Sequence, residues 1–472
     1  MSKEELCKHS ACELKEKIDR QEITSVELTE VVIKRIERIN PIINAYCTPT
    51  FDLARKMASE ADDRVKKSDN LPPLNGLPTS IKDLMLTKGI RTTYGSIIHE
   101  NLVPEEDEIA VQRLLDAGTI MLGKTNTPPF GYVGVTDNQI FGATKNPWHL
   151  ERTPGGSSGG AAAASAAAMS PLALGSDGGG SIRHPACFCG VFGFKPTFGR
   201  VPRYPVNGYA GNHITHYGPI VRYVEDGAMM LDAMKGHDMM DCYSLPDDGI
   251  SYLEKLDDRP TKLKIGWTVN LGWTKAINEE VEKCIAEKVL VFEKLGWTVE
   301  PVKIKIRNPE AAFYAMWTAK FTFDHKRHIR EFGERLDPQF RRMAGGSFSP
   351  TNDHLKALKK RRQFFEKMML AYKKHEIDIL VTPTTAVPAF ELGQSFPPVI
   401  NGKSVSPTGW QPYTFPFNMT HQPAATLPSG FSKDGLPIGM QVIGLKYQDL
   451  LVLQVSKAFQ DLSPWQEKLP EL

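Results

Sequence analysis

Two glycine-serine clusters are the residues of this sequence best suited to chemistry. They lie in segment 153–186, TPGGSSGGAAAASAAAMSPLALGSDGGGSIRHPA, where an alanine-rich stretch separates them. Glycine leaves the backbone bare, so such segments can approach a ligand or each other closely. A serine hydroxyl becomes a nucleophile when a nearby base removes its proton. Close packing of helix on sheet would explain the alanines, but it does not explain two serine clusters.

Two short motifs match known patterns but lack the structural context that those patterns need. Residues 118–125, GTIMLGKT, match the phosphate loop, which requires a strand before the first glycine and a helix after the lysine. Here the variable positions read as the strand itself, and two prolines soon after them prevent a helix. The GGSSG of residues 155–159 matches a nucleophile elbow with Ser157 or Ser158 as nucleophile. It follows a loop, and none of the 12 histidines has a triad context.

Five longer blocks carry a more specific signal. In chain order they are GLPTSIKD (76–83), GKTNTPPFG (123–131), FGATKNPWHLERTPGGSSGG (141–160), ALGSDGGGSIRHPACFCGVFGFKPTFGRV (173–201) and YGPIVRYVEDGAMML (217–231). Together they closely resemble the amidase signature family, densely over residues 74–234 and more loosely towards the C-terminus. The resemblance implies a single α/β domain over residues 1–472, with a mixed central sheet flanked by helices. It also implies a more variable, substrate-side region over residues 235–410.

The resemblance assigns roles to individual residues. Ser181 matches the family's nucleophile, Ser157 its middle serine with a cis peptide bond, and Lys82 its general base. The segment whose N–H groups match the oxyanion hole consists of Gly178, Gly179 and Gly180. The positions that match hydrogen-bonding supports of the triad and its loops are Ser158, Asp177 and Arg183. No cofactor and no metal is implied.

Lys82 can act as a base only if its amine is uncharged near neutral pH. A free lysine has a pKa of about 10.4, a useful base needs about 7–8, and burial alone can lower a lysine pKa that far. We therefore expect Lys82 to be buried, with adjacent Asp83 pointing elsewhere, as alternation along a strand allows. Ser157 would relay the proton of Ser181 to Lys82 and later return it to the leaving nitrogen. The run DGGGS would present consecutive N–H groups to the oxyanion.

The implied activity is hydrolysis of an amide bond through an acyl-enzyme on Ser181, on a small and largely apolar or aryl amide. The alternatives are a carbamate or aryl-ester hydrolase with the same triad, and an A-type subunit of a glutamine-dependent amidotransferase. The block TGWQPYTFPFNMTHQPAATLP (408–428) is closer to stand-alone amidases. Pro129 stands where the family often has an acidic residue, which reshapes a loop near the expected pocket.

Two groups of aromatic residues favour a bulky, uncharged substrate if they line the pocket. Phe313, Trp317 and Phe321 recur at helical spacing, and we expect core packing for them, with a lid over the substrate as the alternative. A second group with the same two readings consists of Trp410, Tyr413 and Phe415.

The elements that must position these residues alternate between helices and buried strands. Thr24 and Glu27 form a capping box for a helix that should run to Asn40 and Pro41. A short strand should lead into Lys82, and the alanine stretch should form a tightly packed helix. Further helices are expected at 51–67, 107–118, 278–296, 354–375 and 447–461, and further strands at 119–124, 297–302, 377–383 and 436–444. This order favours an α/β sandwich around a mixed sheet, with surface loops near 235–262 and 391–410.

The composition excludes several classes of function. The 472 residues are 41% hydrophobic and 24% charged, and a net charge of +2 without a basic stripe argues against a nucleic-acid partner. The longest alanine-rich, uncharged segment, residues 161–169, is too short to span a membrane. Seven irregularly spaced cysteines do not form a disulfide framework, which favours a reducing, cytoplasmic setting. We expect a small-molecule amide or carbamate as the partner, and a homodimer is left open.

Overall fold

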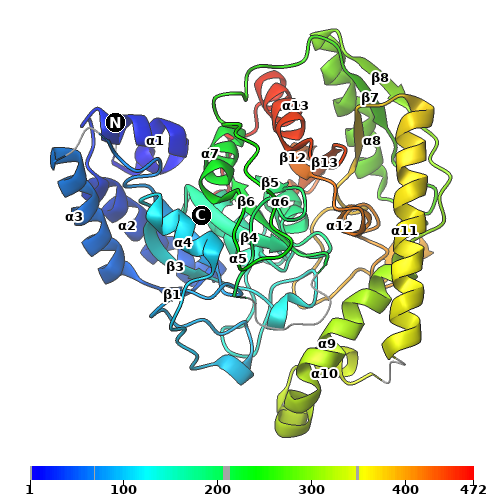
Figure 1. The fold of residues 1–472 in the computed structure, drawn as a ribbon, viewed down its shortest axis with the longest axis horizontal. Helices are drawn as coiled ribbons and strands as arrows, with labels where there is room; N and C mark the ends of the chain where they lie inside the picture. The colour runs from blue at the N-terminus through cyan, green and yellow to red at the C-terminus, as the bar shows by residue number, and fades with distance from the viewer. Residues whose placement is uncertain (1–2, 68–69, 206–212, 347–349) are drawn as a thin grey trace.

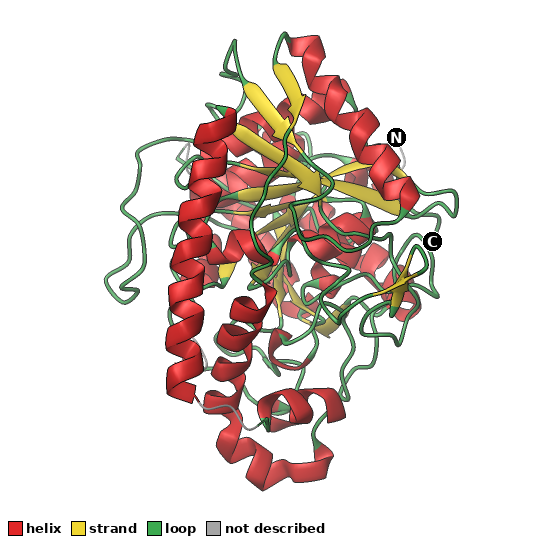
Figure 2. Cartoon of the chain, turned by 90° about the vertical axis from the view of Figure 1, so that its right-hand side faces the viewer, coloured by secondary structure: helices red, strands yellow, loops and turns green. Residues whose placement is uncertain are grey.

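The computed structural model, which describes residues 3–67, 70–205, 213–346 and 350–472, is built around one mixed sheet. Its strand order is β1-β3-β2-β4-β6-β5-β12-β13-β9-β7-β8, and helices flank it as expected (Figure 2). The strands are β1 (Tyr46–Pro49), β2 (Pro78–Lys82), β3 (Ile120–Thr125), β4 (Leu172–Asp177), β5 (Phe192–Lys195), β6 (His216–Val221), β7 (Lys264–Trp267), β8 (Thr298–Pro301), β9 (Ile379–Pro383), β12 (Ala424–Phe431) and β13 (Pro437–Ile443).

Most helices lie where the periodicity of the sequence places them (Figure 1). They are α1 (Ala11–Asp19), α2 (Ser25–Ile43), α3 (Phe51–Lys67), α4 (Ile109–Asp116), α5 (Gly159–Ala166), α6 (Arg183–Cys189), α7 (Val224–Met234), α8 (Glu279–Lys288), α9 (Glu310–Phe332), α10 (Pro338–Ala344), α11 (Pro350–His375), α12 (Phe415–Met419) and α13 (Asp449–Leu462). No helix in the described parts of the chain is long and apolar enough to cross a membrane.

The capping box of α2 is confirmed, but its expected end is wrong. Thr24 and Glu27 exchange side-chain and backbone hydrogen bonds at the N-terminus. The helix continues past Pro41 to Ile43 and ends where Asn44 adopts a left-handed conformation. Proline removes only one N–H donor in this last turn, and Asn44 is a residue type that tolerates the left-handed cap.

Two other segments refine the expectations. Residues 118–125, which match the phosphate-loop pattern, contain β3, and a 3-10 turn at Pro129–Gly131 follows where a phosphate loop would need a helix. The segment 391–410, expected to be a loop, contains a ribbon of two short strands, β10 (Val399–Ile400) and β11 (Lys403–Ser404). Two-residue strands are too short to leave a recognisable alternation in the sequence.

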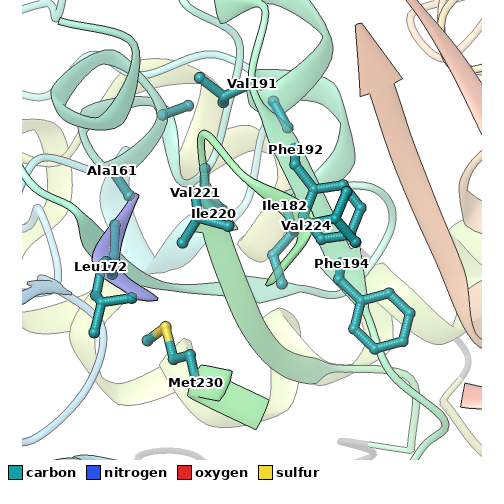
Figure 3. Close-up of a cluster of buried hydrophobic side chains, with 14 of the residues drawn as sticks. Ala161, Leu172, Ile182, Val191, Phe192, Phe194, Ile220, Val221, Val224 and Met230 are labelled. Carbon is teal, nitrogen blue, oxygen red and sulfur yellow. The ribbon is translucent and has the colours of Figure 1, made fainter. Parts of the chain in front are cut away.

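The alanine stretch forms α5, whose residues are all buried. Figure 3 shows Ala161 of α5 in one apolar cluster with Leu172 of β4 and Ile220 of β6. At Gly160 a side chain would collide with the backbone, because a Cβ would lie 2.3 Å from the nitrogen of Asn126. The small side chains therefore let α5 lie directly against the sheet, so that the serine loop before it reaches the ends of the strands.

Helices α9 and α10 and the start of α11 form one end of the molecule, whereas the C-terminal part of α11 packs against the sheet through Tyr372 (Figure 1). α9 packs against both α10 and α11. It also contacts α12, which lies near the end of β4 through the side chain of Asn418. This helical end of the molecule thus comes over the edge of the sheet where the candidate site lies.

Candidate active site

The parallel strands β2 and β4 bring the expected base and the glycine loop to one edge of the sheet. β2 ends at Lys82 and β4 ends at Asp177, and the strands pair with Ile81 opposite Leu174. The carboxyl ends of parallel neighbours meet at the same edge, which is where open α/β sheets bind ligands. Ser176, one residue before the end of β4, shares this edge.

The amine of Lys82 is fully buried and contacts three hydroxyl groups. Lys82 Nζ lies 2.7 Å from Ser157 Oγ and 2.8 Å from Ser158 Oγ. Its third contact is Ser176 Oγ at 3.0 Å. Burial lowers the pKa of Lys82 well below its usual value, and the charge of Asp177 opposes this shift. The expectation of a buried lysine with a depressed pKa is confirmed.

The three hydroxyl contacts of Lys82 suit either an ammonium that donates three hydrogen bonds or a neutral amine that donates two and accepts one. Ser158 donates its hydroxyl proton to the carbonyl oxygen of Ser176 at 3.2 Å, so Ser158 accepts a bond from Lys82. A neutral amine has two N–H groups and one lone pair, so one of its three contacts must be a hydroxyl that donates to nitrogen. Ser157 is able to be that donor, and this is the direction in which a proton leaves an activated hydroxyl.

Asp83 points away from Lys82, as expected. Its carboxylate accepts two hydrogen bonds from the backbone N–H of Thr93, at 3.1 and 3.2 Å, and another from the Thr93 hydroxyl. The carboxylate is fully buried in this turn. No tight ion pair with Asp83 therefore holds Lys82 in its charged form.

The middle serine has the backbone geometry that the resemblance implied. The peptide bond between Gly156 and Ser157 is cis. Ser158 follows directly at the N-cap position of α5, where its hydroxyl bonds to the end of β4 and not to the helix. The backbone N–H of Ser158 donates to the carbonyl oxygen of Ser181 at 3.2 Å, which ties the two serine loops together.

Ser181 lies between these groups and two cavities. Its side chain is 8% exposed, and it lines both a cavity of about 700 Å³ and a smaller one of about 270 Å³. No hydrogen bond joins the hydroxyls of Ser157 and Ser181 within the described residues. Both side chains line the smaller cavity, so the second leg of the proton relay remains a prediction.

The glycine loop differs in one respect from the expected oxyanion hole. The N–H of Gly180 donates to Asp177 Oδ1 at 2.7 Å, so it is not directed at a substrate. Gly178 and Gly179 remain as the candidate donors, and the aromatic rings of α9 pack closely over both of them. Gly180 has a φ of +134°, which side chains rarely adopt, so the glycine serves the turn itself.

Asp177 and Arg183 form a fully buried ion pair that holds the loop. Arg183 donates to Asp177 Oδ1 at 2.8 Å and to Asp177 Oδ2 at 2.9 Å. Burial alone would raise the pKa of Asp177, but Arg183 outweighs it and holds the pKa far below its usual range. The remaining donors of Arg183 bind the carbonyl of Thr414 and the side-chain oxygens of Asn418 and Gln441. The expected supporting role of both residues therefore has a geometric basis.

A second clamp acts on the same loop through Thr414, which precedes α12. The hydroxyl of Thr414 donates to the carbonyl oxygen of Gly179 at 2.8 Å. It lies 2.6 Å from His184 Nε2, which must therefore donate to it. The peptide group between Gly179 and Gly180 is held at both ends, its oxygen by Thr414 and its nitrogen by Asp177.

The larger cavity is mostly apolar. Phe313 and Trp317 of α9 line it together with Trp410, so the expectation of core packing is incomplete for these three side chains. Phe321 lines the smaller cavity, whereas Tyr413 and Phe415 are core residues. Among the described residues that line the larger cavity, Arg342 is the one with a permanent charge, and none is a carboxylate.

The smaller cavity is rich in ionisable groups. It is lined by the catalytic-site hydroxyls of Ser157, Ser176 and Ser181. Its ionisable lining residues are Glu108, Arg203, Lys320, Asp324, His325 and His328. Trp317 also lines it, so this side chain stands between the two cavities.

Sequence reasoning missed several residues of the site. Ser176 could have been found, because it precedes Asp177 on a strand that ends beside Lys82. Thr414, Asn418 and Gln441 lie more than 200 residues from the loop that they hold, and nothing local marks them. The side-chain amide of Asn418 is fully buried and donates to Asp177.

Comparisons with known proteins agree with this geometry. The model of the Amidase family matches residues 27–453. The chain is 36% identical to the A-type subunit of the glutamyl-tRNA(Gln) amidotransferase of Sulfurihydrogenibium sp., covering 99% of this chain and all of the relative. It is 35% identical to an acylamidase of Rhodococcus erythropolis, covering 98% of this chain and 97% of the relative. The solved structure of a bacterial aryl acylamidase of the amidase signature family superposes with a TM-score of 0.90 at 30% identity, covering 97% of both chains.

Proposed function

The chain belongs to the amidase signature family, and on that premise we propose that it hydrolyses small amides through an acyl-enzyme formed on Ser181. Family membership supports a hydrolase that acts on carbon–nitrogen bonds. The buried, hydrogen-bonded amine of Lys82 carries the finer proposal, because its depressed pKa makes it a base near neutral pH.

The proposed reaction uses Ser157 as a proton relay. Ser181 Oγ forms a bond to the carbonyl carbon while its proton passes to Ser157 and that of Ser157 passes to Lys82. The carbonyl oxygen becomes an oxyanion near the N–H groups of Gly178 and Gly179. Lys82 then returns a proton through Ser157 to the leaving nitrogen, and the carbon–nitrogen bond breaks. Water hydrolyses the ester on Ser181 by the same relay and restores the free enzyme.

The larger cavity supports an apolar or aryl acyl group. Phe313, Trp317 and Trp410 supply flat apolar surfaces, and aromatic rings in such pockets contact substrate rings favourably. A volume of about 700 Å³ is within the usual range for small-molecule sites. Carbamates and aryl esters present the same kind of carbonyl, so they belong in the substrate panel.

Labelling with a fluorophosphonate probe tests the proposed nucleophile. We expect the probe to modify Ser181 in the wild type and nothing in Ser181→Ala, as mass spectrometry of the labelled peptide would reveal. A panel of p-nitroanilides, primary amides and aryl carbamates should then identify the preferred carbonyl. Labelling at Ser157 instead would overturn the assignment of the nucleophile.

Ser157→Ala and Ser158→Ala form a matched pair for the relay. Both hydroxyls contact Lys82 at nearly the same distance, 2.7 and 2.8 Å, but only Ser157 is proposed to carry a proton. We expect kcat/KM to fall by about 100-fold or more in Ser157→Ala and by much less in Ser158→Ala. Equal losses in the two variants would mean that the hydroxyls only position Lys82.

The 36% identity to an A-type component of a glutamyl-tRNA(Gln) amidotransferase supports a second candidate, a glutamine-using component of such a complex. Glutamine carries an ammonium and a carboxylate, whereas the described lining of the larger cavity offers Arg342 and no acid. We expect no glutaminase activity from the isolated chain, measured as ammonia release. Glutaminase turnover comparable to that on p-nitroanilides would favour the second candidate.

A further inference from the structure

The two cavities at Ser181 are not equivalent with respect to the proposed proton relay. The proton for the leaving nitrogen comes from Lys82 through Ser157. Ser157 and Ser176 line the smaller cavity, whereas the larger cavity is bounded by Gly179 and by aromatic rings. The leaving amine must therefore lie on the side of the smaller cavity, and the acyl group fills the larger one. This step depends on the proposed function.

Two cations line the smaller cavity. Arg203 lies against the ring of Tyr217, with its guanidinium carbon 4.6 Å from the ring centre. One of its terminal nitrogens donates to the carbonyl of Thr215 at 3.1 Å, which fixes the guanidinium. Lys320 comes from α9, and burial and the charge of Arg203 lower its pKa to about 8, so it is mostly charged at pH 7.

Among the described residues, two buried side-chain atoms beside this cavity form no hydrogen bond of good geometry, and the Tyr217 hydroxyl lies close to both of their side chains. They are Arg203 Nε and Glu108 Oε2. Glu108 is 1% exposed, and its other oxygen accepts from the backbone N–H of Leu86 at 3.0 Å. Both atoms are covered by protein, so a ligand in the cavity would meet the other polar atoms of these lining residues and Lys320. The cavity is thus built for a polar group and not for an apolar one.

The charges favour an anion over a cation. Arg203 cannot lose its proton at accessible pH, whereas burial raises the pKa of Glu108 to about 7, so at pH 7 this carboxyl is about half neutral. A protonated Glu108 is a hydrogen-bond donor, as an anionic ligand requires. Asp324 lies one helical turn from Lys320 and offsets part of its charge, and His325 stays neutral because burial lowers its pKa to about 3.

The geometry points to a substrate whose amine half carries a carboxylate, bound in the smaller cavity by Arg203 and Lys320. The substrate class is therefore the N-acyl amino acids and related N-acyl amino carboxylates, with an apolar or aryl acyl group. The carboxylate would pair with the guanidinium of Arg203, and such a charge-assisted pairing is stronger than a neutral hydrogen bond.

Three amides with the same acyl group test this inference. The phenylacetyl amides of glycine, ethanolamine and ethylenediamine give the same acyl-enzyme but release an anionic, a neutral and a cationic two-carbon amine. We expect kcat/KM for the glycine amide to exceed that for the ethanolamine amide by about tenfold or more, and the ethylenediamine amide to be the poorest. Equal values for glycine and ethanolamine in the wild type would overturn the inference.

Variants of Arg203 and Lys320 test whether these two cations cause the preference for the glycine amide. Arg203→Gln should bring the ratio of glycine to ethanolamine amide close to one, and Lys320→Gln should reduce it in part. Lys326→Gln is the matched control, because Lys326 is an exposed cation on the same helix that lines neither cavity; its ratio should equal that of the wild type. The Tm of each variant, measured by thermal unfolding, shows whether that variant is folded. If Arg203→Gln does not fold, Lys320→Gln decides the question.

The outcomes separate this inference from the function on which it rests. If Ser181 is labelled and p-nitroanilides are cleaved, but none of the three amides is, the amine inference is wrong and the hydrolase stands. A preference for glycine that survives both Arg203→Gln and Lys320→Gln also overturns it. If Ser181 is not labelled and no amide is cleaved, the proposed function itself fails.

Discussion

At the scale of single residues, the site depends on the charge of one amine. Lys82 is surrounded by hydroxyls rather than carboxylates, and its neighbour Asp83 is occupied in a separate turn. Hydroxyls accept and donate equally well, so they do not force the lysine to keep its proton. Burial then favours the neutral form of the Lys82 amine.

Replacing Lys82 by a permanent cation should abolish activity. We expect Lys82→Arg to lower kcat/KM by about 100-fold or more, because a guanidinium cannot take up the proton of Ser157. Lys82→Met is close in size to the wild type and also lacks a base, so its kcat/KM should fall by as much. This variant keeps the test valid if the arginine variant does not fold. Near-normal turnover by folded Lys82→Arg would eliminate Lys82 as the base.

The same residue sets the pH dependence of the reaction. Lys82 must be neutral to act, so kcat/KM of the wild type should rise with pH through its pKa and then level off. Because burial lowers that pKa well below the usual lysine value, the plateau should begin well below pH 10. A pH–rate profile on a neutral amide measures this, and a rise that continues to pH 10 would contradict it.

The residue types of the site could be predicted from the sequence, but their partners could not. The glycine-serine clusters and the lysine before Asp83 stand out locally, and burial of Lys82 follows from the chemistry demanded of it. The engagement of Gly180 by Asp177 depends on how the turn closes, which the run DGGGS alone does not determine. Arg203 and Glu108 meet across the smaller cavity only because separate elements bring them there.

At the scale of elements, the short helix α12 and the residue before it hold the glycine loop at residues 178–180. Thr414 holds the carbonyl of Gly179, and Asn418 holds the carboxylate and the carbonyl of Asp177. Long helices such as α11 are predictable because their apolar period extends over many turns. A five-residue helix such as α12 has no such period, so sequence reasoning missed its role.

Removing the hydroxyl of Thr414 should impair catalysis more than binding. Thr414→Val keeps the shape of the buried side chain but releases the carbonyl of Gly179, so the adjacent N–H groups lose their alignment. We expect kcat to fall by about 10- to 100-fold with little change in KM. Thr414→Ser keeps the hydroxyl and should restore most of the loss. A variant that changes KM alone would assign Thr414 to substrate binding.

At the scale of the whole molecule, one of the links between the N-terminal helices and the body of the fold is a buried carboxyl. Asp226 of α7 is 1% exposed, and its Oδ1 accepts from the backbone N–H of Cys12 in α1 at 3.0 Å. Burial raises the pKa of Asp226 to about 8. The unfolded chain would release this proton near pH 4, so the folded form holds it over a wide pH range.

Asp226 should make the protein less stable as the pH rises. A carboxyl whose pKa is raised in the folded state contributes stability that is full below about pH 4 and is lost as the pH rises through about 8. Asp226→Asn keeps the acceptor for Cys12 without the charge. We expect the Tm of this variant, relative to wild type, to be higher at pH 8 than at pH 6. A Tm difference between variant and wild type that does not change with pH would refute the raised pKa of Asp226.

The place of β12 and β13 in the sheet has a consequence for synthesis of the protein. These strands lie between β5 and β9, and the residues that brace the glycine loop come just before them. A ribosome must therefore deliver nearly the whole polypeptide before the loop around Ser181 can be braced. A message broken upstream of codon 414 would yield a nascent fragment that contains Ser181 but lacks the residues that hold its loop.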